Sequence, residues 1–257
     1  MRVAVISDIH GHLLALDAVL VDIAARRVDL TVCLGDITFS GPHPSDCARR
    51  VLALVGPVVM GNCDQASVDY SRAGGVPLEH EDSYTRLGKW VREIDLWSSL
   101  ALTDDDVAWL AALPLTALVE LGPGASLLLA HGSPSSFNTR LTPDMPDDAL
   151  RAALGGVERE PGLIGLACGH THVPMVRDLG GFTVVNPGSV GLPMAKDATG
   201  ASYNPANYAE YALISWKNGA LSVDLRRVVV DAEAVRADAA ARGMPRLDRW
   251  RTDMRRD

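Results

Sequence analysis

The chain has 257 residues, 47% of them apolar, and a formal net charge of −8. This length allows one large α/β domain or two small ones, and the apolar fraction is enough for a buried core. An acidic surface repels a phosphate backbone, so we expect no stable nucleic-acid binding. A small phosphorylated substrate remains compatible, because the charge of a site can oppose that of the whole surface.

Other classes of protein are also disfavoured. No run of about 18 apolar residues is present, so neither a transmembrane helix nor a membrane partner is expected, and the first residues resemble a strand and not a signal peptide. The cysteines form no CxxC pair, which argues against a disulfide scaffold and against a Cys-rich zinc site. A cytoplasmic enzyme is the simplest interpretation, and a homo-oligomer stays open.

The first quarter of the chain predicts alternating strands and helices. Strands are expected at 2–7, 30–34 and 57–60, and helices at 12–27 and 45–54, where apolar residues recur at helical spacing. Such alternation is typical of βαβ units with a parallel sheet.

The pattern changes at residues 65–112, which show no strand and contain Trp90, Trp97 and Trp109. We interpret this stretch as a helical insertion that caps the site and influences the choice of substrate. The alternative is that its tryptophans only pack the insertion onto the core.

The second half predicts mostly β structure. Strands are expected at 115–120, 125–130, 163–168, 182–185, 208–216 and 221–229. The last two are joined by Asn218-Gly219, a strong hairpin signal. A helix is expected from about 231, followed by the Arg-rich tail 242–257, for which a solvated helix is expected and a subunit contact is the alternative. The whole pattern favours a single domain over 1–241, in which two packed β-sheets are flanked by helices.

Five polar clusters each follow a predicted strand. They are Asp8-Ile9-His10, Gly35-Asp36, Gly61-Asn62-Cys63-Asp64, His131-Gly132 and Gly169-His170-Thr171-His172. Since the carboxyl ends of strands in α/β sheets gather at one edge, we expect these clusters to converge. Carboxylate, amide and imidazole ligands suit Mn, Fe, Zn, Co or Ni. Each residue alone would more often be a turn former or a structural histidine, so only the joint pattern predicts a metal centre.

The order of the motifs D-x-H, G-D, G-N-x-D, H-G and G-H-x-H resembles that of the calcineurin-like metallophosphoesterases. The details SDIHG, GNCD and NPGSVG are similar to the small bacterial and archaeal phosphodiesterase branch of that superfamily. The resemblance implies an α/β/β/α sandwich and a two-metal-dependent phosphoesterase. It further implies a phosphodiesterase, which hydrolyses phosphate esters by attack of a metal-bridging hydroxide.

The resemblance also implies two divalent transition-metal ions, with manganese favoured. One ion is expected at Asp8, His10 and His172, the other at Asn62, His131 and His170, and Asp36 is expected to bridge them. Asp36, Asn62 and His131 are then catalytic as well. Two alternatives stay open: a phosphomonoesterase or nucleotide pyrophosphohydrolase on the same site, and a non-catalytic metal-binding scaffold, against which the complete set of ligands argues.

The sequence departs from better-known members of the superfamily at two places. Their protein phosphatases carry an arginine shortly after the G-D motif, where this chain has Ile-Thr-Phe-Ser at 37–40, so protein phosphatase activity is not expected. Cys63 stands where many relatives have a histidine proposed as general acid. Cys63 is interpreted as a small packed residue, or as a proton donor or soft ligand, and Asp64 as able to orient an imidazole placed at position 63.

Contacts to the substrate, a small phosphorylated molecule such as a nucleotide, are the least defined. His12, His43 and Cys63 are the candidates, and exposure to water is the alternative for the two histidines. Asn186 in the NPGSVG motif is expected to stabilise the loop beside His170 and His172.

Overall fold

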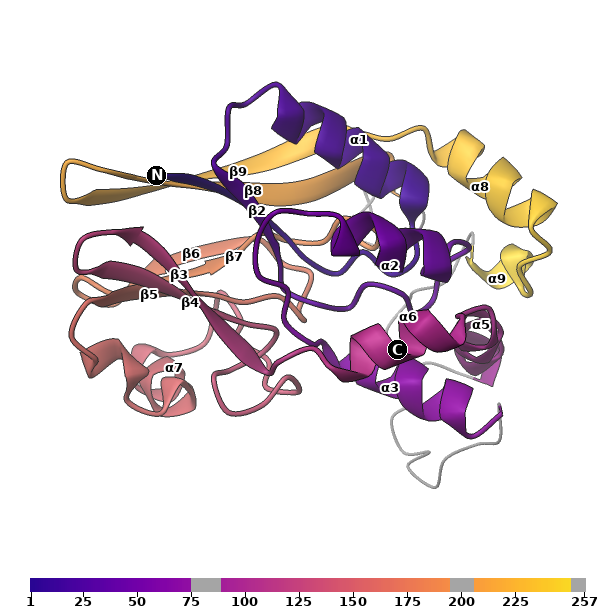
Figure 1. Cartoon of the computed structure of the whole chain (residues 1–257), viewed down its shortest axis with the longest axis horizontal. Helices are drawn as coiled ribbons and strands as arrows, with labels where there is room; N and C mark the ends of the chain where they lie inside the picture. The colour runs from indigo at the N-terminus through magenta and orange to yellow at the C-terminus, as the bar shows by residue number, and fades with distance from the viewer. Residues whose placement is uncertain (75–88, 195–205, 251–257) are drawn as a thin grey trace.

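The computed structural model describes residues 1–74, 89–194 and 206–250. Within these ranges two β-sheets are stacked face to face, and helices cover both outer faces (Figure 1). The predicted sandwich of two sheets flanked by helices is therefore confirmed.

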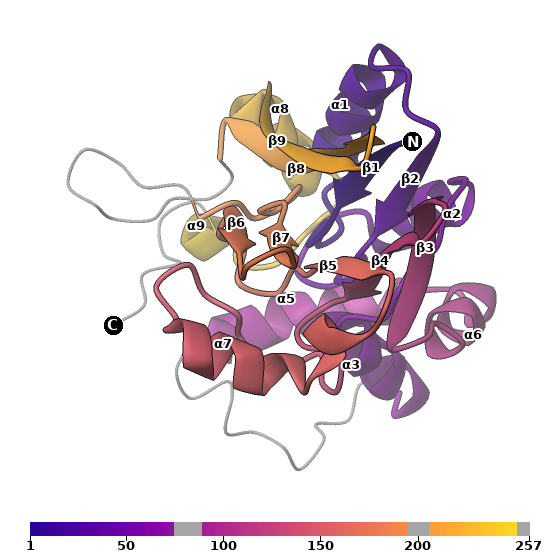
Figure 2. The ribbon, with the colours of Figure 1, turned by 90° about the vertical axis from the view of Figure 1, so that its left-hand side faces the viewer.

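The first sheet has the strand order β2-β1-β8-β9. Its strands are β1 (Arg2–Ile6), β2 (Leu30–Cys33), β8 (Tyr208–Lys217) and β9 (Ala220–Val229). β1 pairs in parallel with β2 and antiparallel with β8, so the sheet is mixed. Helix α1 (Leu13–Ala24) packs on β8 and β9, and α2 (Pro44–Leu52) lies beside α1 (Figure 2).

The second sheet has the strand order β3-β4-β5-β7-β6. Its strands are β3 (Thr116–Gly122), β4 (Ala125–Ala130), β5 (Leu163–Ala167), β6 (Met175–Asp178) and β7 (Thr183–Asn186). Helix α7 (Asp147–Leu154) lies against the outer face of this sheet, on the side away from α1 (Figures 1 and 2). A short 3₁₀ turn, Val157–Arg159, follows it.

Alternation along β1 explains why the sheets stack. Val3 and Val5 point into the apolar layer between the two sheets, whereas Ala4 and Ile6 point into the layer under the helices. A strand that is buried on both faces must be apolar along its buried length, and the four buried positions 3–6 are Val-Ala-Val-Ile. β1 is consequently a central strand, and the turn that follows it is fixed between two cores.

The structure corrects the sequence prediction at three elements. Residues 57–60 form no strand of their own: Val58 makes a single bridge to Cys33, because Pro57 has no N–H to donate and the segment ends at Gly61. Helix α7 and strand β6 were not predicted. Helix α7 has only eight residues, and β6 is an edge strand with the charged residues Arg177 and Asp178, so neither shows a clear apolar pattern.

The described part of the 65–112 stretch is helical. Its helices are α3 (Asn62–Arg72), α5 (Lys89–Leu100) and α6 (Asp104–Ala111), and residues 75–88 lie outside the described ranges. Trp97 and Trp109 are half-buried and pack against the core beneath the first sheet, which favours the packing alternative for these two side chains. The side chain of Trp90 is outside the described part.

The beginning of the Arg-rich tail is not the solvated helix that the sequence predicts. After α8 (Ala232–Ala241), Met244 and Trp250 are buried, and the short helix α9 (Leu247–Trp250) packs against the core. Buried apolar side chains and the ion pair of Arg246 with Glu93 together hold this segment against the core. Residues 251–257 are outside the described ranges. None of the described helices is long and apolar enough to cross a membrane.

Candidate metal centre

The predicted ligands lie together where strands of both sheets end. Asp8 and His10 follow β1, Asp36 follows β2, and Asn62 is the first residue of α3. His131 follows β4, while His170 and His172 follow β5. The convergence expected from the five sequence clusters is therefore what the fold produces.

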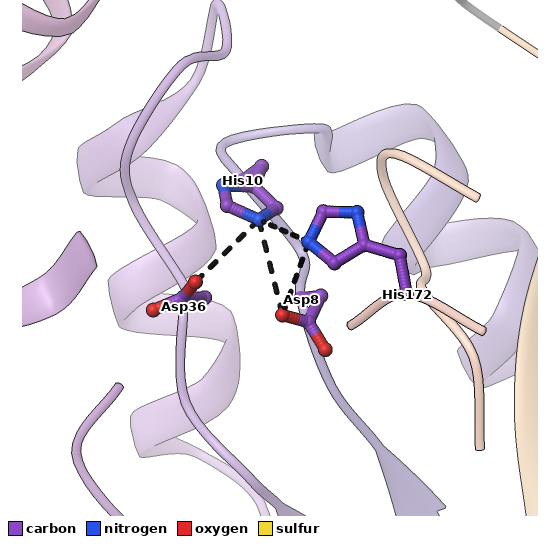
Figure 3. Close-up of side chains that lie close together, drawn as sticks. All are labelled: Asp8, His10, Asp36 and His172. Atoms are coloured by element: carbon purple, nitrogen blue, oxygen red, sulfur yellow. Dashed lines mark hydrogen bonds and ion pairs between the residues drawn. The ribbon is translucent and has the colours of Figure 1, made fainter. Parts of the chain in front are cut away.

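The ligand atoms form two groups that share one residue. Those of Asp8, His10, Asp36 and His172 lie within 4.8 Å of one another, and so do those of Asp36, His131 and His170 (Figure 3 shows the first group). In the first group Nε2 of His172 is 3.1 Å from Nε2 of His10 and 3.3 Å from Oδ1 of Asp8. In the second group Nε2 of His131 is 3.3 Å from Oδ2 of Asp36 and 3.0 Å from Oδ1 of Asn62.

Backbone carbonyls fix which nitrogen of each ring faces the centre. Nδ1 of His10 lies 3.1 Å from the carbonyl oxygen of Phe39, Nδ1 of His131 lies 2.8 Å from that of Leu34, and Nδ1 of His172 lies 2.6 Å from that of Leu192. A carbonyl can only accept a hydrogen bond, so each Nδ1 carries the proton. Nε2 is then a lone-pair donor that points to the centre, as in a metal-bound histidine.

These contacts fit a divalent cation. The lone pairs of the two Nε2 atoms of His10 and His172 face each other at 3.1 Å, which is unfavourable unless a positive charge lies between them. Oδ1 of Asp8 is fully buried and has no hydrogen-bond partner among the described residues. A buried carboxylate oxygen without a partner is costly, and a cation would satisfy it. The donor set of nitrogen and oxygen atoms suits transition-metal ions.

The pKa values of the rings show where the cluster favours positive charge. Burial lowers the pKa of His10 to about 4, and burial together with the charge of His131 lowers the pKa of His170 to about 4. Burial opposes the charge on His131 as well, but the carboxylates of Asp36 and Asp8 outweigh it and raise the pKa to about 9. Nε2 of His131 therefore carries a proton near neutral pH in the metal-free protein, and a divalent cation beside Asp36 would displace that proton and use the lone pair.

Most of the ligands sit in a strained backbone conformation. The φ angles are 55° at Asp8, 51° at His10, 53° at Asp36, 66° at His170 and 57° at His172. Residues other than glycine rarely adopt positive φ, and each instance costs of order 1 kcal/mol or more unless its surroundings hold it in place. The positive φ angles belong to tight turns, and these turns direct the side chains toward the centre.

Two glycines allow those turns to approach one another. A Cβ added at Gly61 would lie 2.1 Å from Oδ1 of Asp36, and one at Gly169 would lie 2.7 Å from Oδ2 of Asp8. Any larger residue at either position would displace a ligand carboxylate.

Asp64 holds the turn that carries Asp36. The carboxylate of Asp64 is fully buried and accepts hydrogen bonds from the backbone N–H groups of Asp36, Ile37 and Gly61. Burial and the charge of Asp36 raise the pKa of Asp64 to about 7, while the N–H groups favour its ionised form. The expectation that Asp64 is available to orient a side chain at position 63 is wrong, because these backbone groups occupy both of its oxygens.

The NPGSVG motif supports the other side of the centre. Nδ2 of Asn186 donates to the carbonyl oxygen of Gly169 and to Oγ1 of Thr171, and Oδ1 accepts from the N–H of Gly188. Asn186 therefore braces the segment that carries His170 and His172, as the sequence predicts.

The candidate substrate residues lie outside the two ligand groups. His12 is 2% exposed and its ring stacks on Trp250, and His43 is 4% exposed with its two ring nitrogens against Asp46 and Asp238. Neither geometry supports a contact with substrate, and both assignments stay predictions. Cys63 is half-buried; its backbone N–H donates to Oδ1 of Asp36, and burial raises the pKa of its thiol well above the ordinary value.

Arg140 is a residue that the sequence did not single out. It is exposed, lies at the end of the segment that follows His131, and is near enough to His170 for its charge to oppose protonation of that ring. Seven residues separate it from the H-G motif, so no motif spacing could have identified it. A fixed positive charge beside a metal ligand is suited to an anionic substrate.

The family model described as a calcineurin-like phosphoesterase superfamily domain matches residues 1–206, and the chain belongs to this family. Membership indicates a metal-binding hydrolase that acts on phosphoesters.

Individual proteins resemble this chain over most of its length. An uncharacterized protein of Methanocaldococcus jannaschii is 28% identical over 237 residues, which cover 89% of this chain and 88% of the relative. The crystal structure of a metallophosphoesterase from Sphaerobacter thermophilus is 25% identical and has a TM-score of 0.69, covering 97% of this chain and 98% of that one. A hypothetical protein of Pyrococcus horikoshii shares the fold, with a TM-score of 0.76, 20% identity and 98% coverage of both chains.

Proposed function

We propose that the chain is a phosphodiesterase with a two-metal centre. The observation that carries the proposal is the position of Asp36, which belongs to both ligand groups. One ion would be held by Asp8, His10 and His172, the other by Asn62, His131 and His170, and Asp36 would join the two. Manganese is the ion we favour, among Mn, Fe, Zn, Ni and Co.

Two divalent ions would polarise the phosphoryl group and lower the pKa of the attacking water. The chain's own residues perform the remaining tasks. The carbonyl contacts of His10, His131 and His172 keep each Nε2 directed at the centre, so no reorganisation is needed when substrate binds. The N–H of Cys63 holds one oxygen of Asp36 and leaves Oδ2 facing the ligand atoms.

The surroundings of Asp36 favour a diester over a monoester. A diester carries a single negative charge on its phosphate, whereas a monoester carries close to two near neutral pH. The segment after Asp36 offers no cation: Ile37 is fully buried and apolar, and Ser40 is hydrogen-bonded to Asp95 and Ser98. The absence of a cation from this segment suits the less charged substrate, and the exposed Arg140 near His170 supplies one positive charge.

The test is metal analysis combined with turnover of two related substrates. The protein loaded with Mn²⁺ should contain two ions per chain and hydrolyse bis(p-nitrophenyl) phosphate with a higher kcat/KM than p-nitrophenyl phosphate. Preference for the monoester, or for a dinucleoside polyphosphate in the same assay, would replace the diesterase by a phosphomonoesterase or a pyrophosphohydrolase. Two bound ions without turnover of any of these would indicate a scaffold.

A further inference from the structure

The buried stack of His12 and Trp250 connects the end of the described chain to the metal centre. The ring centroids are 5.3 Å apart and the rings are inclined by 28°. Both side chains are almost completely buried, at 2% for His12 and 3% for Trp250. The established family activity assigns no task to this pair, although His12 is only two positions from the ligand His10.

His12 closes the turn that presents the first ligand group. Its backbone N–H donates to the carbonyl oxygen of Ile9 at 3.1 Å, which folds residues 9–12 into a tight turn, and its carbonyl oxygen accepts from Leu16 at the start of α1. The turn contains His10 at positive φ, and Asp8, directly before the turn, also has positive φ. A strained turn of this kind persists only if packing from outside restrains it.

One side of this turn is held by the segment 189–192. Oγ of Ser189 donates to the carbonyl oxygen of Asp8 at 2.7 Å, and the N–H of Gly191 donates to the same oxygen at 3.0 Å. A Cβ at Gly191 would come within 2.9 Å of Cδ2 of His12, so the imidazole lies directly against this segment. The carbonyl of Leu192 in turn fixes His172.

Trp250 restrains the other face of the His12 ring. Helix α9 is anchored independently of the centre, since the Arg246 guanidinium donates to both carboxylate oxygens of Glu93 in α5, at 2.6 and 2.7 Å. The backbone N–H of Trp250 donates to the carbonyl oxygen of Arg246. The imidazole of His12 is thus positioned by Gly191 and Trp250.

We propose that Trp250 is a positioning residue for the first ligand group, Asp8, His10 and His172, and acts through His12. This inference rests on the two-metal centre proposed above. The second group depends on other contacts, from Leu34 to His131 and from Cys63 to Asp36. Loss of the stack should therefore weaken one metal site and spare the other.

The experiment separates the two sites with single-site backgrounds. His170→Ala removes a ligand of the second group and leaves the first group complete. His172→Ala removes a ligand of the first group and leaves the second group complete. Mn²⁺ affinity is measured in each background from the electron paramagnetic resonance signal of free Mn²⁺. An aromatic pair changes an equilibrium constant by roughly two- to tenfold, so Trp250→Leu should raise the Kd about fivefold in the His170→Ala background. In the His172→Ala background the change should be less than about twofold.

Two matched variants make the effect specific. Trp250→Phe keeps a ring against His12 and should restore the affinity, whereas Trp109→Leu removes a tryptophan from the same core without touching the turn and should leave both sites unchanged. The inference would be overturned if Trp250→Leu weakened Mn²⁺ binding equally in both backgrounds, or did not weaken it in the His170→Ala background.

Two further outcomes are kept apart by the design. If circular dichroism shows that Trp250→Leu does not fold, the stack is removed from the other side with His12→Leu, and His12→Phe is the control that keeps a ring. His12→Leu should weaken Mn²⁺ binding in the His170→Ala background and not in the His172→Ala background. Any other result contradicts the proposal. A wild type that binds a single Mn²⁺ would refute the two-metal centre, while the effect of Trp250 on the first group is still read in the His170→Ala background.

Discussion

Two segments that carry candidate metal ligands are built in different ways. The turn after β1, residues 7–12, is buried at every position. The segment after β4 starts with the buried His131 and then opens, and its positions 134–140 are half-buried or exposed up to Arg140. One segment is enclosed by two cores and a C-terminal tryptophan, while the other faces solvent.

The difference separates two tasks of the same centre. A buried turn keeps ligands such as Asp8 and His10 fixed, because packing from several elements opposes any change of their strained backbone. An exposed segment tolerates changes of sequence and can meet different substrates without disturbing the ligands. We therefore expect variants of the enclosed turn to change metal binding, and variants of the open segment to change the use of substrate.

The largest effect is expected at Asp36, because this residue belongs to both ligand groups. Asp36→Asn removes a charge and an oxygen ligand from both groups and should lower kcat for bis(p-nitrophenyl) phosphate by at least ~10²-fold, with weaker binding of Mn²⁺. Asp224→Asn, at an exposed carboxylate of β9, is the matched control and should behave as wild type. Near-normal turnover by Asp36→Asn with two bound ions would remove Asp36 from the bridging position.

The open segment is tested at Arg140. A charge-assisted contact is worth about 1.5–3 kcal/mol, so Arg140→Gln should reduce kcat/KM by roughly 10- to 100-fold if Arg140 binds the phosphate, with unchanged Mn²⁺ content. Arg159→Gln, at another exposed arginine, should have no effect. A loss of metal from Arg140→Gln would show that the open segment also supports the ligands, which contradicts the comparison.

The enclosed side is tested at Asn186. Asn186→Ala removes the brace of Gly169 and Thr171 and leaves their polar groups unpaired. Outer contacts of this kind typically change metal affinity by 10- to 100-fold, and we expect the lower end, about tenfold, measured as the Kd for Mn²⁺. Activity at saturating Mn²⁺ should recover to near the wild-type value. Failure to recover would mean that Asn186 contributes to the reaction and not only to the position of the loop.

The smallest effect is expected at Cys63. The raised pKa of its thiol keeps it protonated, but a thiol is a weak hydrogen-bond donor. Cys63→His should change the rate for p-nitrophenyl esters by less than about threefold, because that leaving group needs little protonation. Alkyl esters should gain about fivefold, a modest part of general-acid assistance since Asp64 is not free to orient the imidazole. Plots of rate against leaving-group pKa for both proteins give the comparison, and parallel slopes would exclude position 63 from proton transfer.

Much of the fold followed from patterns that the chain repeats over several residues. The alternating apolar strands, the Asn218-Gly219 hairpin and helix α1 were predicted because each has enough positions to show its period. The eight-residue α7 has only two buried positions, and the edge strand β6 contains Arg177 and Asp178 in place of an apolar run. Pro57 interrupted a strand that its apolar neighbours suggested.

The ligands could be predicted because each one lies in a short motif. Asn186 could be predicted to support them for the same reason, but other supporting contacts could not, since the partners are far apart in the chain: Asp64 bonds Asp36 across 28 positions, and Trp250 lies 238 positions from His12. Arg140 was missed for a different reason, because an exposed arginine carries no pattern of its own. Contacts between distant segments depend on packing, which sequence periodicity does not encode.

The central position of β1 has a consequence for the synthesis of the chain. β1 pairs with β8, and the amino terminus itself donates to the carbonyl oxygen of Trp216, 215 residues later. At a translation rate of 5–20 residues per second, β1 waits roughly 10–40 s for this partner. During that interval Val3 and Val5 have no second strand on that side to pair with, and neither the 189–192 segment nor Trp250 is yet available to restrain the turn at Asp8. The contacts that restrain the first ligand group are therefore complete only after Trp250 has been synthesised.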